Sequence, residues 1–159
     1  MSEEIEISLY RPELRADFER LNRLWLEAHS LLEAADLVYL EDPDRHILAD
    51  GGQVFFAIQG GEVVGTCAAI RVSATTFELA KLSVAQAARG RGLGRRLCKL
   101  VLDYASAAGA TEIVLSSNSS LVDAIHLYES LGFQHASLPA DLRYATANVF
   151  MQRSLGYPA

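Results

Sequence analysis

The hydrophobic positions along the chain predict strands and helices in alternation. Residues 5–10 alternate loosely between apolar and polar side chains, which is typical of a strand that ends before Pro12. A helix is predicted over about residues 13–32, because apolar side chains recur there at helical spacing. These side chains are Phe18, Leu21, Trp25, Ala28 and Leu32. The acidic segment 33–50, which Pro43 interrupts, is compatible with a short helical turn.

The middle of the chain predicts three strands and a long helix. Residues 54–59 and 63–72 are apolar segments on either side of a Gly-Gly pair, which is typical of a hairpin. Residues 77–84 form the third strand. An apolar stripe then predicts an amphipathic helix over residues 93–109, with the last glycine as its end. The side chains of the stripe are Leu93, Leu97, Leu100, Val101, Tyr104 and Ala108.

The last third of the chain predicts one more helix between short strands. Residues 112–115 form an apolar strand, and residues 116–120 form a polar loop. Helical spacing of apolar side chains predicts a helix over residues 121–131, before a glycine. Residues 133–137 and 144–155 are predicted to be the last two strands.

This order of elements predicts a single α/β domain over residues 1–159. Strands followed by helices pack as a mixed sheet with helices against it, rather than as a bundle or a barrel. The strands at 77–84 and 112–115 are expected to be a parallel pair, joined by a right-handed crossover through the helix between them.

Composition narrows the class of protein. The 159 residues carry a net charge of −6, half of them are hydrophobic, and a nucleic-acid binder would instead show a basic face. The two cysteines, Cys67 and Cys98, are too few for a disulfide framework and indicate a reducing compartment, where both are expected to be buried. We expect no secretory signal, because the acidic start lacks an apolar segment, and the apolar runs are shorter than the roughly 20 residues that span a bilayer. We therefore expect a cytoplasmic protein without a membrane segment.

The positive charge is concentrated in one segment. Between Leu79 and Leu102 there are six basic residues and no acidic one, which leaves 8 basic and 20 acidic residues in the rest of the chain. The basic residues are Lys81, Arg89, Arg91, Arg95, Arg96 and Lys99. Because this segment coincides with a cluster of glycines, it indicates an anion site, whereas the remaining surface tolerates a cation.

The glycine cluster has the features of a phosphate-binding turn. Gly90, Gly92 and Gly94 lie between a predicted strand and a predicted helix, where free backbone N–H groups and the helix dipole both favour an anion. A dinucleotide fingerprint would need glycine at Arg95, and a Walker loop would need Gly-Lys-Ser/Thr, so neither fits. The scattered histidines show no metal-ligand spacing, and a metal is not expected. They are His29, His46, His126 and His135.

The segment 89–94, Arg-Gly-Arg-Gly-Leu-Gly, resembles the pyrophosphate loop of the GCN5-related N-acetyltransferase (GNAT) superfamily, whose signature is Gln/Arg-x-x-Gly-x-Gly/Ala. Residues 77–84 and the Ser-Ser-Asn at 116–118 are similar to the same family. Residues 124–133 resemble its Ala-x-x-Leu-Tyr-x-x-x-Gly-Phe element. The resemblance implies a mostly antiparallel sheet with a central parallel pair that splays apart, and helices on both faces.

The resemblance also implies that acetyl-CoA binds in the gap between the splayed strands, without a metal. The pantetheine arm would lie along Leu82, Ser83 and Val84, through backbone N–H and C=O groups of the first and last of these. Asn118 would bind the amide region of the cofactor, although an asparagine there is also typical of a turn or a helix cap. The pyrophosphate would be held by Arg89, Gly90, Arg91, Gly92, Leu93, Gly94 and Arg95.

Two catalytic roles follow from the resemblance. Glu78 occupies the position of the family's glutamate base, and strand alternation would place it on the same face as Leu82 and Val84. An ion pair with a nearby Arg or Lys is the alternative role for this glutamate. Tyr128 matches the family's general acid, which protonates the CoA thiolate; a core aromatic is the alternative role.

The sequence defines the acceptor less closely than it defines the cofactor. We expect direct transfer to a primary amine of a small or amino-acid-like molecule, because acidic residues in the regions that form acceptor pockets in this family would attract a cation. The alternatives are a protein lysine or N-terminus as acceptor, or an acyl-CoA binding module without catalysis. The resemblance also leaves a homodimer open. The residues of these regions are Trp25, Glu27, Glu33, Asp36, Tyr39, Glu41, Asp42, Tyr144 and Asn148.

Overall fold

Within residues 4–156, a mixed sheet of 7 strands organises the fold, in the order β1-β2-β3-β4-β5-β7-β6. The computed structural model describes residues 4–156. All neighbouring strands are antiparallel except β4 and β5, which are parallel. The strands are β1 (Ile5–Leu9), β2 (Gln53–Gln59), β3 (Glu62–Arg71), β4 (Thr76–Val84), β5 (Glu112–Ser117), β6 (Gln134–Ala136) and β7 (Val149–Ser154).

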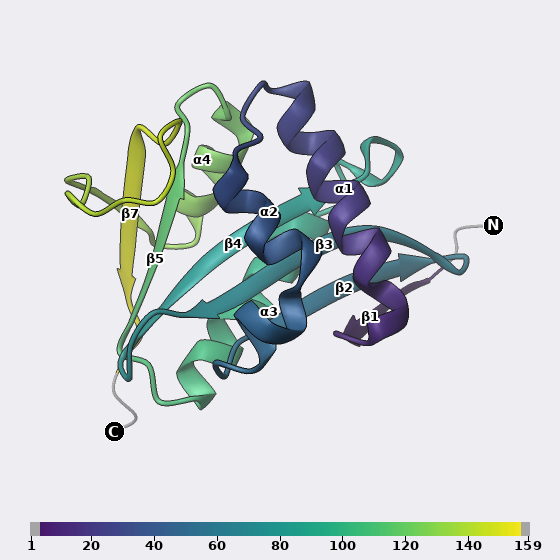
Figure 1. The fold of residues 1–159 in the computed structure, drawn as a ribbon, viewed down its shortest axis with the longest axis horizontal. Coiled ribbons are helices and arrows are strands. Elements are labelled where there is room, and N and C mark those ends of the chain that lie inside the picture. The colour runs from purple at the N-terminus through teal and green to yellow at the C-terminus, as the bar shows by residue number, and fades with distance from the viewer. Residues whose placement is uncertain (1–3, 157–159) are drawn as a thin grey trace.

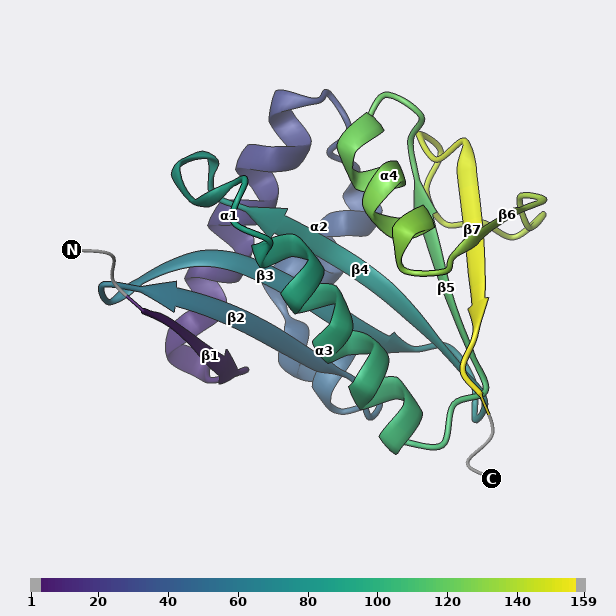
Figure 2. The same cartoon turned by 180° about the vertical axis from the view of Figure 1, so that it is seen from behind.

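Helices cover both faces of the sheet. The helices are α1 (Arg15–Ala28), α2 (Ala34–Glu41), α3 (Leu93–Ala107) and α4 (Val122–Ser130). Helices α1 and α2 lie on one face (Figure 1), and α3 and α4 lie on the other (Figure 2). The predicted α/β class, with a mixed sheet between helices and a parallel pair at its centre, is confirmed. None of the helices in residues 4–156 is both long and apolar enough to cross a membrane.

Several predicted boundaries are wrong. Helix α1 is shorter than residues 13–32, because Ser30 adopts a left-handed backbone conformation with φ of 56°. The acidic segment 33–50 forms more than one short turn: it contains α2 and a π-helical turn at Asp44–Leu48. Helix α2 starts with a capping box, in which the side chains of Glu33 and Asp36 each accept a hydrogen bond from the other's backbone N–H.

The predicted bounds of β7 and β5 also differ from the observed ones. The last predicted strand, 144–155, begins only at Val149, so residues 137–148 form a long loop beside the parallel pair. Strand β5 continues through Ser117, although the sequence predicts a polar loop from residue 116. Polar side chains are therefore carried on the open end of β5.

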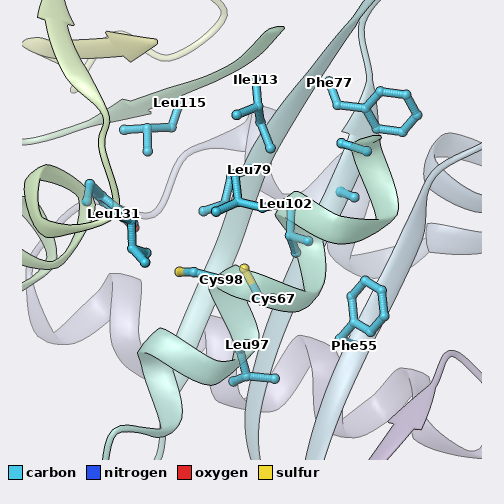
Figure 3. Packing of buried hydrophobic residues seen from close by; sticks show 14 of the residues in the cluster. Phe55, Cys67, Phe77, Leu79, Leu97, Cys98, Leu102, Ile113, Leu115 and Leu131 are labelled. Atoms are coloured by element: carbon cyan, nitrogen blue, oxygen red, sulfur yellow. The ribbon is translucent and has the colours of Figure 1, made fainter. Parts of the chain in front are cut away.

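The sheet separates two hydrophobic cores. Under α1 and α2, the rings of Phe18 and Phe56 meet edge to face with centroids 6.2 Å apart. Under α3 and α4, Cys67 of β3 and Cys98 of α3 lie beside each other in the core (Figure 3). Both thiols are free and buried, as predicted. Burying each large apolar side chain contributes about 1.5–3 kcal/mol, so the two cores hold the helices firmly on the sheet.

Candidate active site

The central parallel pair opens into a gap. Strands β4 and β5 pair only from Thr76 with Glu112 to Glu78 with Val114. Beyond these residues the strands diverge, as the ribbon shows (Figure 2). The unpaired ends of β4 and β5 border two adjoining cavities, one at the glycine turn and one between the loop 137–148 and α1.

The first cavity, which we call the phosphate groove, lies at the N-terminus of α3. Its volume is about 360 Å³, which is in the range of small-molecule sites. Leu82, Ser83, Val84, Trp25 and Tyr128 contribute to one side of it. From the glycine turn, its lining residues are Arg89, Gly90, Gly92, Leu93, Gly94 and Arg95.

The backbone of the turn exposes a set of free donors. The N–H groups of residues 90–95 donate to no acceptor in the described part of the chain, whereas those of Arg89 and Arg96 bond to Gln86 and Gly92. Gly90 and Gly92 have φ of 81° and 75°, and a Cβ on either would meet no atom within 4 Å. An anion can therefore approach these amides closely, and the helix dipole favours it.

The arginines of residues 89–95 differ in the groups that their side chains contact. The Nε of Arg89 donates to the carbonyl of Val84 at 3.0 Å, and its guanidinium stacks on Trp25 at 5.0 Å. Arg95 donates to the hydroxyl of Ser130 at 2.6 Å. Arg91 is exposed and lies outside the residues that line the groove.

A bulge in β4 reorients the strand at the edge of the groove. Lys81 has φ of 57°, and the register with β3 shifts between Thr66 and Ala68. The carbonyl of Lys81 accepts a hydrogen bond from Thr66 Oγ1 at 2.9 Å, and this hydroxyl accepts one from Asn22 Nδ2 at 3.0 Å. The backbone carbonyl at the bulge and the Thr66 hydroxyl therefore have hydrogen-bond partners within the protein.

The bulge reverses the side-chain alternation, so the predicted common face of Glu78, Leu82 and Val84 is wrong. Leu82 and Val84 pack on the core under α3, whereas Glu78 pairs with Ile70, which belongs to the core under α1 and α2. Ser83 donates to the carbonyl of Leu21 on α1 at 3.1 Å. The N–H groups of Leu82 and Val84 face the gap, because the N–H of Ala85 bonds to the carbonyl of Val64 on β3 at 2.8 Å and successive N–H groups of a strand alternate in direction.

The second cavity, which we call the acceptor pocket, has a volume of about 110 Å³. Glu78, Lys81 and Tyr144 lie in its lining, and so does Asp36. It meets the phosphate groove through residues that line both cavities, namely Trp25, Leu82, Leu121 and Tyr128. The glycine turn and the buried carboxylate of Glu78 therefore lie on one continuous cleft.

Glu78 is a buried acid with a basic partner. Its side chain is 7% exposed, and Arg143 Nη2 donates to its Oε1 at 2.6 Å. Burial raises the pKa of Glu78 to about 7, against the opposing attraction of Lys81. A carboxyl group with this pKa is half deprotonated near neutral pH and suits a general base.

Lys81 and Asp36 form a buried ion pair beside Glu78. Their side chains are 6% and 4% exposed. The Lys81 Nζ also lies 3.5 Å from the Tyr144 hydroxyl and faces the rings of Tyr144 and Tyr39. The pair links the bulge of β4 to α2 across 45 residues of sequence, and sequence patterns alone carried no signal for it.

The acidic side chains of this region are largely engaged within the protein. Besides Asp36, Glu33 accepts hydrogen bonds from the backbone N–H groups of Ala145 and Thr146 at 2.9 and 3.2 Å. Glu33 and Asp36, which are among the acidic residues that the sequence predicts to attract a cationic acceptor, are therefore already engaged by partners within the protein. Asn118 is engaged as well: its Nδ2 donates to the Thr146 carbonyl at 2.7 Å, and it lines the acceptor pocket rather than the phosphate groove.

Tyr128 lies at the junction of the two cavities. Its ring packs on Phe133, and its hydroxyl donates to none of the residues in 4–156. Burial, together with the nearby thiols of Cys98 and Cys67, raises the pKa of Tyr128 well above its usual value. The hydroxyl therefore keeps its proton at neutral pH. In the same described range, His, Cys, Asp and Glu form no group of three or more that fits a metal ion.

Comparison with known proteins assigns this arrangement to a class. The family model described as "Acetyltransferase (GNAT) family" matches residues 13–133. The chain therefore belongs to the GNAT acetyltransferase family, which confirms the family predicted from the sequence.

Individual relatives agree with this assignment. The chain is 31% identical over 115 residues to N-acetyltransferase family 8 member 2 of Rattus norvegicus, covering 69% of this chain and 51% of the relative. It is 35% identical over 106 residues to N-acetylaspartate synthetase of the same species, covering 65% of this chain and 36% of that relative. The chain thus spans about half or less of the length of these curated relatives.

The fold is shared with solved acetyltransferases. A putative acetyltransferase from Salmonella typhimurium, solved with acetyl-CoA, superposes with a TM-score of 0.75 at 22% identity and covers 98% of this chain and 96% of its own. At this identity, the likeness shows the fold.

Proposed function

We propose that this chain is an acetyl-CoA-dependent N-acetyltransferase, which acts on the primary amine of a small-molecule or amino-acid-like acceptor. One observation carries the proposal: the phosphate groove and the pocket of Glu78 meet at Leu82 and Tyr128. A donor molecule held in the groove would thus reach an acceptor held beside a buried base. Family membership and the N-acetyltransferase relatives support this reading.

The residues of the groove fit acetyl-CoA. The free N–H groups of residues 90–95 match a pyrophosphate, and the open space in front of Gly90 and Gly92 lets it approach. The N–H groups of Leu82 and Val84 are available to the amides of pantetheine. The carbonyl of Val84 is already bonded to Arg89, so we assign the pantetheine contact to its N–H.

Glu78 acts as the general base in this proposal. Acetyl-CoA supplies a thioester, whose C–S bond breaks as the acceptor nitrogen forms its bond to the acetyl carbon. An amine attacks only when it is neutral, yet a primary ammonium has a pKa near 10. Glu78, with a pKa of about 7, takes that proton on its carboxylate, directly or through a water molecule.

Tyr128 acts as the general acid. The CoA sulfur leaves as a thiolate, and the protonated hydroxyl of Tyr128, at the junction of the cavities, gives it a proton. The raised pKa of Tyr128 keeps that proton available at neutral pH. The relative N-acetylaspartate synthetase is named for an acetylated amino acid, which supports an amine of this type as acceptor.

The test is release of CoA thiol from acetyl-CoA in the presence of pooled small amines. We expect turnover by the unmodified chain and about 10²- to 10⁴-fold lower rates for Glu78→Gln and Tyr128→Phe. Both variants should retain CoA affinity in calorimetry, because neither side chain holds the phosphates. Equal rates in all three proteins would contradict the two roles.

The same assay separates the alternative functions. CoA binding without turnover of any acceptor would indicate a binding module, and turnover of lysine-bearing peptides alone would indicate a protein acetyltransferase. The single-domain organisation, the cytoplasmic location and the homodimer stay predictions from the sequence.

A further inference from the structure

Among the described charged residues around the acceptor pocket, Arg143 is the exposed cation that contacts Glu78. Asp36 is paired with Lys81, and the carboxylate of Glu33 is held by hydrogen bonds from backbone amides of the loop 137–148. Lys81 is likewise held by Asp36. The charged pair that remains for an acceptor is Glu78 with Arg143.

Arg143 is held in place without being enclosed. Its side chain is 47% exposed, whereas that of Glu78 is 7% exposed. The guanidinium lies over the rings of Tyr39 and Tyr144, with centroids 5.2 and 5.9 Å away. Its one hydrogen bond among the described residues is to Glu78. A guanidinium has five N–H donors in a planar fork, so most of them stay free for a ligand.

These free donors border a further cavity of about 160 Å³. Glu78, Ser116 and Tyr144 line both this cavity and the acceptor pocket. Glu78 therefore lies where the two cavities meet, and a small molecule that extends from the acceptor pocket into this cavity contacts both Glu78 and Arg143.

We infer that the acceptor is an α-amino acid, whose carboxylate binds the guanidinium of Arg143 while its amine binds Glu78. In an α-amino acid the ammonium and the carboxylate are attached to one carbon. They form a pair of opposite charges in near contact, which complements the Glu78–Arg143 pair charge for charge. A simple amine would satisfy Glu78 alone. This inference rests on the proposed function and makes Arg143 the residue that selects the acceptor.

The first test compares matched acceptors with the unmodified chain. Each set contains an α-amino acid, its carboxamide and its decarboxylated amine, which share one side chain and differ in the carboxylate. Because hydrogen bonds to charged groups are strong, we expect kcat/KM for the amino acid to exceed that of both analogues by about 10- to 100-fold, mainly through KM. Equal or faster acetylation of the decarboxylated amines would overturn the inference and leave the proposed function standing.

The second test uses Arg143→Gln and Arg143→Lys. We expect Arg143→Gln to reduce the ratio of kcat/KM for amino acid over amine to about one, and Arg143→Lys to restore part of it, because lysine keeps the charge and loses the fork. Arg20→Gln, at an exposed arginine of α1, is the matched control and should keep the ratio. If Arg143→Gln lowers all acceptors equally, Arg143 is structural and the inference fails. If the unmodified chain binds CoA and acetylates no acceptor, the proposed function fails with it.

Discussion

Glu78 and Leu82 lie on the same strand, yet their side chains occupy opposite faces of the sheet. The cause is the left-handed residue Lys81 between them, which shifts the register of β4 against β3. The strand thereby presents a buried acid to the acceptor pocket and, a few residues later, backbone amides and apolar side chains to the phosphate groove. One bulge thus divides β4 into an end that faces the pocket of Glu78 and an end that faces the cavity at the glycine turn.

The pH dependence of the reaction should report Glu78. Its carboxyl must lose a proton to act as a base, so we expect kcat/KM to rise as the pH passes through about 7. Lys81 lowers the pKa of Glu78, and Lys81→Met should therefore move this rise to higher pH. The exposed Lys99, replaced by Met, is the control. An unchanged profile in Lys81→Met would show that the rise belongs to another group.

Substitutions in the glycine turn should abolish cofactor binding. Gly92→Asp places a negative charge where the amides of residues 90–95 converge, and we expect CoA affinity to fall by more than about tenfold in calorimetry. Gly61→Asp is matched in backbone conformation, with φ of 78° against 75°, and lies in the β2–β3 turn away from the groove. Similar losses from both variants would attribute the effect to backbone strain instead of charge.

The buried Lys81–Asp36 pair should be costly to break from one side. Asp36→Asn leaves an ammonium unpaired in the pocket, and we expect the free energy of unfolding to fall by about 3–5 kcal/mol in urea titrations. Lys81→Met combined with Asp36→Leu should recover most of this loss. Asp17→Asn, in an exposed pair with Arg20, should change it by less than about 1 kcal/mol. Additive losses in the double variant would mean that the two side chains are not coupled.

The cysteines should be inert in the folded protein. Burial raises the pKa of Cys67, and Cys98 lies beside it in the core. We expect neither thiol to react with a disulfide reagent until urea unfolds the chain, and Cys98→Ala to keep turnover. Rapid labelling of the native protein, or an acetyl group carried on Cys98, would favour a covalent route.

The parts of the site that depend on local sequence were predictable. The glycine turn, the start of α3 and the position of Tyr128 on α4 each follow from spacing within a short stretch of chain. The phosphate groove could therefore be assigned to residues 89–95 before the fold was known, although Arg91 lies outside its lining.

The acceptor side was not predictable, for a physical reason. Arg143 and Glu78 are 65 residues apart, and their contact depends on how the loop 137–148 folds back over the sheet. The bulge was also hidden, because a left-handed residue is usually signalled by glycine or asparagine and here it is Lys81. Without the bulge, strand alternation placed Glu78 on the wrong face.

The stack of Arg89 on Trp25 has a thermodynamic consequence. Trp25 belongs to the walls of both cavities, and Arg89 holds it while donating to the carbonyl of Val84. A ligand phosphate that draws this guanidinium away removes one contact of the indole, which also packs on the ring of His29 with centroids 4.3 Å apart. If binding of acetyl-CoA changes the affinity for the acceptor through this contact, linkage requires that the acceptor changes the affinity for acetyl-CoA by the same factor. The two substrates would then bind cooperatively, to an equal degree in each direction.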